Sequence, residues 1–334
     1  MKTTPNTQAV GLDVGTSRIV VARRPENEIA YESQLNAFVA IPHSKITQTV
    51  LEREKVSHSV SAGEIIVHGN ESDKLASLLN AETRRPMSQG VLDAKEPESL
   101  RMMREILSTM LGPANGKSGR EKLCFTVPAA PLGGEGSLTY HESTLRQILT
   151  DLGYQPVSIN EGLAVVYAEL EESNYTGIGI SCGGGLCNVC LAYLSVPVLS
   201  FSVPKAGDFI DSNASAVTGE RANRIRLVKE DSFHFNGFFA DKIQQVIGVY
   251  YDDMIRSLVG AMKEAFARTS GAQFQRPMPL VLSGGTTTPP GFRKRFEELL
   301  AEQNLPITIS EIRMAENPLH TTAKGALVYA LSDL

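Results

Sequence analysis

Near its N-terminus the chain reads Ala9-Val10-Gly11-Leu12-Asp13-Val14-Gly15-Thr16-Ser17-Arg18-Ile19-Val20-Val21-Ala22. Two apolar, β-branched runs flank a short turn of small residues, so the segment is predicted to form a β-hairpin. Such a turn exposes backbone N–H groups and hydroxyls that can bind phosphate oxygens. The Asp13 carboxylate just before the turn can hold Mg²⁺ through water. Taken alone, the pattern also fits a structural turn that Asp13 caps.

Two more glycine-rich turns follow strand-like segments. Ser181-Cys182-Gly183-Gly184-Gly185-Leu186 lets the backbone approach a ligand closely, although a loop is the alternative. Ser283-Gly284-Gly285-Thr286 follows an apolar strand and suits a flat ligand such as adenosine. The strand–turn–strand arrangement of residues 10–22 recurs at 177–194, which predicts two similar α/β halves with a ligand between them.

The composition is that of an ordinary globular protein. The chain has 334 residues, of which 42% are hydrophobic and 21% charged, and this length predicts two domains or one large bilobed unit. A formal charge of −5 gives no general attraction to nucleic acid or anionic lipid. Four cysteines are too few for a disulfide framework, so a reducing, cytoplasmic location is predicted. The sequence shows neither a signal peptide nor an apolar run approaching the ~20 residues of a membrane span.

Hydrophobic periodicity predicts the main helices. One helix is predicted from Pro97 to Met110, with Leu100 among its inward positions. A single helix is expected at about Ala214–Val228 and a second at Ala240–Phe266. The last helix follows an Asn-Pro cap, and Leu319 is expected to point inward from it.

The three glycine turns, in this order, resemble the phosphate 1, phosphate 2 and adenosine motifs of the actin / heat-shock-chaperone / sugar-kinase ATPase superfamily. Within it the likeness is greatest to MreB, the bacterial actin homologue. Arg85-Pro86-Met87-Ser88-Gln89-Gly90-Val91-Leu92-Asp93 is similar to that family's Arg-Pro-Met/Leu-x-x-Gly-Val-Ile-x-Asp run. Further similar elements are Ile159-Asn160-Glu161, Ala206-Gly207-Asp208-Phe209-Ile210-Asp211 and Gly219-Glu220.

The resemblance implies an α/β, actin-like (ribonuclease H-like) fold, with two mixed-sheet domains around a nucleotide cleft. Domain I would comprise residues 1–160 and 318–334, with a small subdomain IB at 32–85. Domain II would comprise residues 161–317, with a reduced small subdomain IIB at about 212–270. The chain would cross between the domains along the helices that begin and end domain II.

The resemblance also assigns roles around the cleft. Asp13 would hold Mg²⁺, and Glu161 would orient the attacking water as a base. The alternative for Glu161 is a first-turn carboxylate favoured by the helix dipole. The residues that would contact ATP or GTP are Gly15, Thr16, Ser17, Gly183, Gly184, Gly185, Gly207, Glu220, Asn223, Gly284, Gly285 and Thr286.

The chain departs from the family at the second phosphate turn. Ser181 stands where an Asp is usual, Leu186 replaces a Thr, and Asn188 replaces an acidic residue. Serine cannot supply the charge that helps to hold the metal and its water shell. We therefore expect weakened or absent hydrolysis with binding retained. Asn223 and Arg226 replace the Glu and Lys more frequent in MreB relatives, so nucleotide preference is expected to differ.

Subdomain IIB is expected to be trimmed. Only about residues 230–239 separate its two helices, where MreB relatives have a β-containing insertion. Its aromatic residues fit either a partner contact or packing of the helix tips. They are Phe233, Phe235, Phe238 and Phe239.

Two other features predict no further site. Loop 112–121, which corresponds to a membrane-contacting loop of MreB relatives, has no bulky apolar pair, so direct membrane insertion is not supported. Cys182, Cys187 and Cys190 are interpreted as core residues, because strand positions three apart point to opposite faces. The six histidines show no metal-ligand spacing.

The leading interpretation is an actin-like, nucleotide-binding cytoskeletal protein that self-associates into filaments and is at most a slow ATPase. The alternative is a non-polymerising adaptor that recruits protein partners, as in the FtsA and PilM relatives. Those relatives lack the subdomain at 32–85 and carry one later in domain I, which favours the MreB interpretation. A sugar kinase would need a substrate-binding Asp that the chain does not supply.

Overall fold

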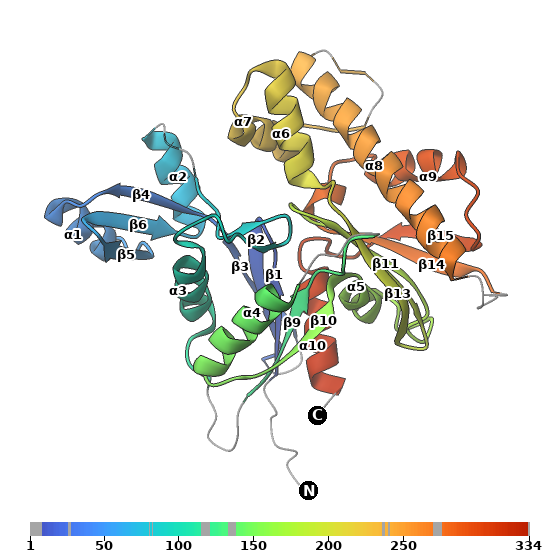
Figure 1. Cartoon of the computed structure of the whole chain (residues 1–334), viewed down its shortest axis with the longest axis horizontal. Helices are drawn as coiled ribbons and strands as arrows, with labels where there is room; N and C mark the ends of the chain where they lie inside the picture. The colour runs from blue at the N-terminus through green and yellow to red at the C-terminus, as the bar shows by residue number, and fades with distance from the viewer. Residues whose placement is uncertain are drawn as a thin grey trace, which may run out of the picture.

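The computed structural model describes residues 9–25, 28–79, 81, 83–114, 121–132, 138–235, 238–239, 241–269 and 276–332. They form two lobes that stand side by side, with helices α5 and α10 between them (Figure 1). We call residues 9–160 the first lobe and residues 177–314 the second lobe.

The first lobe is built on a mixed five-stranded sheet in the order β10-β9-β1-β2-β3. Strands β1 (Ala9–Val14), β2 (Arg18–Arg23) and β3 (Ala30–Leu35) are antiparallel, and the predicted hairpin is confirmed. Strands β9 (Lys122–Val127) and β10 (Gln155–Asn160) run parallel to β1. The hairpin turn is thereby placed at the end of the central strand.

Helices α3 (Ser99–Leu111) and α4 (Thr139–Asp151) share one hydrophobic cluster with this sheet. The predicted helix is therefore present, but the expectation for Leu100 is wrong, since this side chain is 44% exposed. Leu100 lies in the first turn of α3, ahead of the positions that reach the core. The predicted loop at 112–121 lies mostly outside the described residues, which omit 115–120.

An outer corner of the first lobe, at the left of Figure 1, carries a second, antiparallel sheet in the order β4-β6-β5. A short β7–β8 hairpin connects this corner to α3. The elements are β4 (Phe38–Pro42), α1 (Lys45–Arg53), β5 (His58–Ser61), β6 (Glu64–His68), α2 (Asn70–Leu78), β7 (Met87–Ser88) and β8 (Val91–Leu92).

The second lobe repeats the topology of the first. Its sheet has the order β13-β12-β11-β14-β15, in which β11, β12 and β13 are antiparallel and β14 and β15 run parallel to β11. Its strands are β11 (Gly177–Cys182), β12 (Cys187–Tyr193), β13 (Val196–Val203), β14 (Met278–Ser283) and β15 (Ile309–Met314). The second glycine turn therefore occupies the position that the β1–β2 turn has in the first lobe.

The prediction of one helix over 214–228 is wrong. The chain forms α6 (Gly207–Thr218) and α7 (Ala222–Asp231), because Gly219 adopts a left-handed conformation with φ 78° and ends α6. A glycine at this position is a common helix stop, since it lacks a Cβ. The long α8 (Lys242–Arg268) and α9 (Phe292–Ala301) complete the lobe.

The aromatic residues after α7 mainly pack the lobe's interior. Phe233 stacks on Tyr251 with ring centroids 5.1 Å apart, and Phe235 meets the same ring edge-on. Phe239 stacks on Phe233 at 5.3 Å. The packing alternative therefore holds for these three, whereas Phe238 is 77% exposed.

Helices α5 (Glu161–Glu169) and α10 (Thr321–Ser332) cross between the lobes, where the two domain crossings were expected. A Cβ added to Gly325 would lie 1.8 Å from the Ala164 carbonyl oxygen, so the two helices touch backbone to backbone. Leu319 precedes α10, is 45% exposed and lines the cavity described below, so the expectation that it points into the core is wrong.

The core interpretation of the cysteines is confirmed. Cys182, Cys187 and Cys190 are buried free thiols, and Cys190 packs on the opposite side of the sheet from Cys187. Within the part of the chain that the structure describes, no helix combines the length and apolarity needed to cross a membrane.

Candidate functional site

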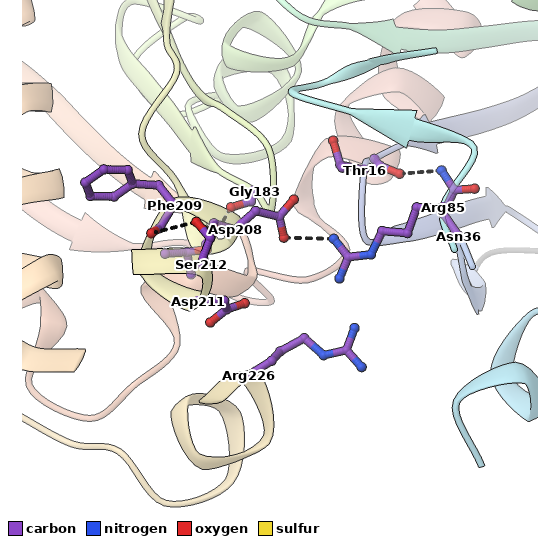
Figure 2. A network of polar contacts seen from close by, with 12 residues as sticks. Thr16, Asn36, Arg85, Gly183, Asp208, Phe209, Asp211, Ser212 and Arg226 are labelled. Carbon is purple, nitrogen blue, oxygen red and sulfur yellow. Dashed lines mark hydrogen bonds and ion pairs between the residues drawn. The ribbon is translucent and has the colours of Figure 1, made fainter. Parts of the chain in front are cut away.

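A cavity of about 250 Å³ lies between the lobes where the three glycine turns meet. The first lobe contributes the β1–β2 turn, and the second contributes the β11–β12 turn and the turn after β14. Helices α5, α6 and α7 supply further polar lining. Figure 2 shows Thr16 of one lobe facing Gly183 and Asp208 of the other.

Most of the predicted site residues line this one cavity. They are Asp13, Gly15, Thr16, Ser17, Glu161, Ser181, Gly183, Gly184, Gly185, Gly207, Gly284, Gly285 and Thr286. Side chains from two lobes and from sequence positions far apart therefore converge as the three motifs predicted.

Glu220 and Asn223 do not line the cavity. Glu220 instead accepts a hydrogen bond from Arg224 at 3.0 Å, at the start of α7. Arg226, which the resemblance to MreB already indicated, lines the cavity one turn further along α7, and Lys229 and Glu230, which the sequence prediction missed, line it in the next turn. Their i+3 and i+4 spacing from Arg226 is the signal that would have identified these two, had α7 been given its correct start.

The two phosphate-type turns are packed closely against each other. A Cβ on Gly184 would lie 2.3 Å from Ser17 Oγ, and one on Gly185 would lie 2.5 Å from Thr16 Oγ1. Among the described residues, the backbone N–H groups of Thr16, Ser17, Gly184 and Gly185 have no protein acceptor. Unpaired N–H donors on facing turns suit the oxygens of a phosphate chain.

Two carboxylates lie beneath these turns. Asp13 accepts hydrogen bonds from Thr126 and Thr322, each at 2.6 Å, and burial raises its pKa. Burial and the neighbouring Asp13 raise the pKa of Glu161 to about 8, although a 3.2 Å hydrogen bond from Ser181 opposes the rise. In the ligand-free protein Glu161 is therefore largely protonated near neutral pH, and a protonated carboxyl is a poor base.

The carboxylates also fit Mg²⁺ bound in the company of a phosphate ligand. Within the described ranges no group of three or more His, Cys, Asp or Glu side chains could hold a metal ion alone. Mg²⁺ typically takes one or two protein carboxylates and fills its other positions with water and phosphate oxygens. Asp13 and Glu161 match that limited donor set.

Ser181 and Asn188, two of the residues that depart from the family pattern, are cross-strand partners on β11 and β12. Asn188 is fully buried, and its Oδ1 accepts a 2.8 Å hydrogen bond from the Ala129 backbone N–H. This donor fixes the orientation of the amide. A hydrogen bond from the Asn188 side chain also opposes the rise in the pKa of Glu161. The centre of the site therefore carries neutral groups beside its two carboxyls.

Two cations of α7 enter the cavity already paired with carboxylates. Lys229 Nζ lies 2.7 Å from Asp211 Oδ1 and donates to the Gly207 carbonyl at 3.0 Å. Burial raises the pKa of Asp211, and Lys229 offsets part of that rise. Arg226 forms an ion pair with Asp73 of the first lobe.

The raised pKa of Glu161 predicts a pH-dependent stability of the ligand-free protein. The folded state keeps a proton that the unfolded chain releases between the ordinary pKa of 4.5 and about 8. The contribution of this bound proton to the stability of the folded protein is therefore fully present below pH ~4.5 and is lost as the pH rises towards ~8. We expect Glu161→Gln to be stabilised relative to wild type by about 3 kcal/mol more at pH ~8.5 than at pH ~5.5.

Urea unfolding of both proteins at the two pH values measures this difference. Glu172→Gln, a substitution at an exposed position, is the matched control and should follow the wild type. Equal pH slopes for wild type and Glu161→Gln would contradict the assignment of a buried proton to this residue.

Solved structures of actin-like proteins match the fold. The MamK double helical filament matches with a TM-score of 0.72 at 19% identity, over 98% of this chain and 99% of that chain. MreB 5 of Spiroplasma citri bound to AMPPNP matches with a TM-score of 0.71 at 11% identity, over 99% and 98%. The ethanolamine utilization protein EutJ from Carboxydothermus hydrogenoformans matches with a TM-score of 0.55 at 16% identity, over 98% of this chain and 91% of that chain. These matches confirm the predicted α/β, actin-like fold.

The sequence comparisons give a more specific result. No curated protein matches the chain significantly. The profile of the Volactin family matches residues 8–330, a span that includes all three glycine turns, both lobes and the crossing helices. With almost its whole length matched, the chain belongs to the Volactin family.

Proposed function

We propose that this protein is an actin-like cytoskeletal protein of the cytoplasm that binds ATP or GTP with Mg²⁺ between its lobes and self-associates into filaments. The observation that carries the proposal is the convergence of unpaired N–H groups from two facing glycine turns above Asp13 and Glu161. The nucleotide-bound neighbours support it, since MreB 5 of Spiroplasma citri was solved with AMPPNP and with ADP.

Each part of the nucleotide has candidate partners on this chain. Thr16, Ser17 and residues 183–185 would bind the phosphates through their backbone N–H groups. Asp13 would hold Mg²⁺, which would neutralise phosphate charge when bound. The nucleoside would lie between residues 284–286 and the cavity-facing side of α7. In the proposed division, domain I is 1–160 with 318–334 and includes subdomain IB at 32–85; domain II is 161–317, with its reduced subdomain IIB at about 212–270.

The same residues support slow or absent hydrolysis. A general base must be unprotonated to accept the proton of the attacking water, whereas Glu161 holds its own proton until positive charge is brought beside it. Ser181 offers a hydroxyl where a second charged ligand would help to fix the metal's water shell. The site therefore suits retention of nucleotide better than rapid turnover.

Isothermal titration with Mg-ATP and Mg-GTP, followed by electron microscopy of the same samples, tests the proposal. We expect saturable binding of at least one nucleotide and filaments that depend on its presence. Magnesium-free titrations are the control and should show weaker binding. Binding without filaments under all conditions would favour the adaptor alternative, and absence of binding by either nucleotide would overturn the proposal.

A further inference from the structure

Two ion pairs join the lobes across the cavity. Arg85 of the first lobe donates to Asp208 Oδ1 of α6 at 2.8 Å (Figure 2). Arg226 of α7 donates to Asp73 of α2, on the outer corner of the first lobe. Of this second pair, Arg226 lines the cavity whereas Asp73 does not. The Asp73–Arg226 contact therefore links a residue of the site to the opposite lobe.

The Asp73–Arg226 pair is largely shielded from water, so each charge relies on the other for stabilisation. The side chains of Arg226 and Asp73 are only 10% and 24% exposed. The second carboxylate oxygen of Asp73, Oδ1, is buried and has no hydrogen-bond partner among the described residues. Arg226 is thus the ionic partner that holds this carboxylate in the closed arrangement.

A pair of this kind can be broken and remade at modest cost. Taking two charges out of water offsets much of their mutual attraction, so a buried ion pair adds little net stability. If the lobes separate at this point, both charges and the unpaired Oδ1 regain water. Removing one partner alone destabilises the closed arrangement of the lobes more strongly, because the other charge then stays poorly solvated whenever the lobes close.

We propose that Asp73 and Arg226 form a latch that closes the nucleotide cleft, and that opening of this latch limits nucleotide release. The inference rests on the proposed nucleotide binding and adds its regulation. A nucleotide bound beside α7 lies on the cavity side of Arg226, while Asp73 holds Arg226 from the other lobe. Asp73 is therefore a positioning residue that acts through Arg226.

Release of a fluorescent ATP analogue, chased with excess unlabelled ATP in a stopped-flow instrument, tests the latch. We expect Asp73→Asn to release the analogue about tenfold faster, because the neutral amide no longer holds the guanidinium. The conservative variant Asp73→Glu keeps the carboxylate and leaves Arg226 unchanged, so it should retain most of the slow release. Glu71→Gln is the matched control on the same helix, since Glu71 pairs with Lys74 at the surface, and it should match the wild type.

A second measurement needs no nucleotide. Ile46 on α1 and Leu227 on α7 are 79% and 51% exposed, and the native cysteines are buried, so introduced cysteines at these positions can be spin-labelled selectively. We expect Asp73→Asn to lengthen and broaden the distance between the labels in ligand-free protein. The Glu71→Gln control should leave it unchanged.

The two readouts separate failure of the latch from failure of the proposed function. An unchanged distance in Asp73→Asn would overturn the latch even if no nucleotide binds. A longer distance with unchanged release would also overturn it, since opening would then not limit exchange. Absence of nucleotide binding in the wild type would instead overturn the proposed function, while the distance measurement would still test the closure.

Discussion

Replacement of Gly184 by valine is expected to lower nucleotide affinity by at least about 100-fold, or roughly 3 kcal/mol. A Cβ at this position would lie 2.3 Å from Ser17 Oγ and 3.2 Å from Ser17 Cβ. The branched side chain would therefore enter the space between the two phosphate-type turns and push them apart. Isothermal titration with Mg-ATP measures the loss.

The matched control is Gly260→Val, because a Cβ at Gly260, on α8, would meet no atom within 4 Å. It should bind nucleotide as the wild type does. Thermal unfolding of both variants establishes that the valine at 184 acts on the site and not on the fold. Unaltered affinity in a folded Gly184→Val protein would show that this turn does not contact the phosphates.

Replacement of Ser181 by aspartate is expected to accelerate hydrolysis by about 100-fold, since one preorganised electrostatic contact is worth ~3 kcal/mol. Ser181 Oγ lies 3.2 Å from Glu161 Oε2, so a carboxylate here adds negative charge beside the two carboxyls. With Mg²⁺ present this charge has a partner and can help to order the attacking water. Phosphate release under saturating Mg-ATP measures the gain.

Two further variants complete this experiment. Ser181→Asn has a similar shape without the charge and should stay slow, while Glu161→Ala should abolish the gain in the aspartate background. No gain in Ser181→Asp alone would indicate that Leu186 and Asn188 have also moved the site away from hydrolysis. Fast wild-type turnover that survives Glu161→Ala would contradict both the weakened ATPase and the role of Glu161.

The glycine turns that line the cavity are features of local sequence. A hairpin turn or a glycine pair at a strand end is set by a few adjacent residues, so residues 13–17, 181–186 and 283–286 could be identified directly. Their convergence followed from the internal repeat, because two sheets of the same topology bring corresponding turns to facing positions.

The parts that were missed depend on helix phase and on contacts between lobes. Glu220 and Asn223 lie at the start of α7 and do not line the cavity, whereas Lys229 and Glu230, further along the helix, do. Arg226 and Asp73 are 153 residues apart, and no local pattern relates them. Only the packing of one lobe against the other makes them neighbours.

The contact between α5 and α10 has a mechanical consequence. With no side chain between Gly325 and the Ala164 carbonyl, the helices cannot move closer, and a change in their crossing angle is the movement that keeps this contact. Helices α2 and α7 lie at the far ends of the two lobes from this crossing (Figure 1). A small rotation about this contact would therefore displace α2 and α7 further than it displaces the elements close to Gly325.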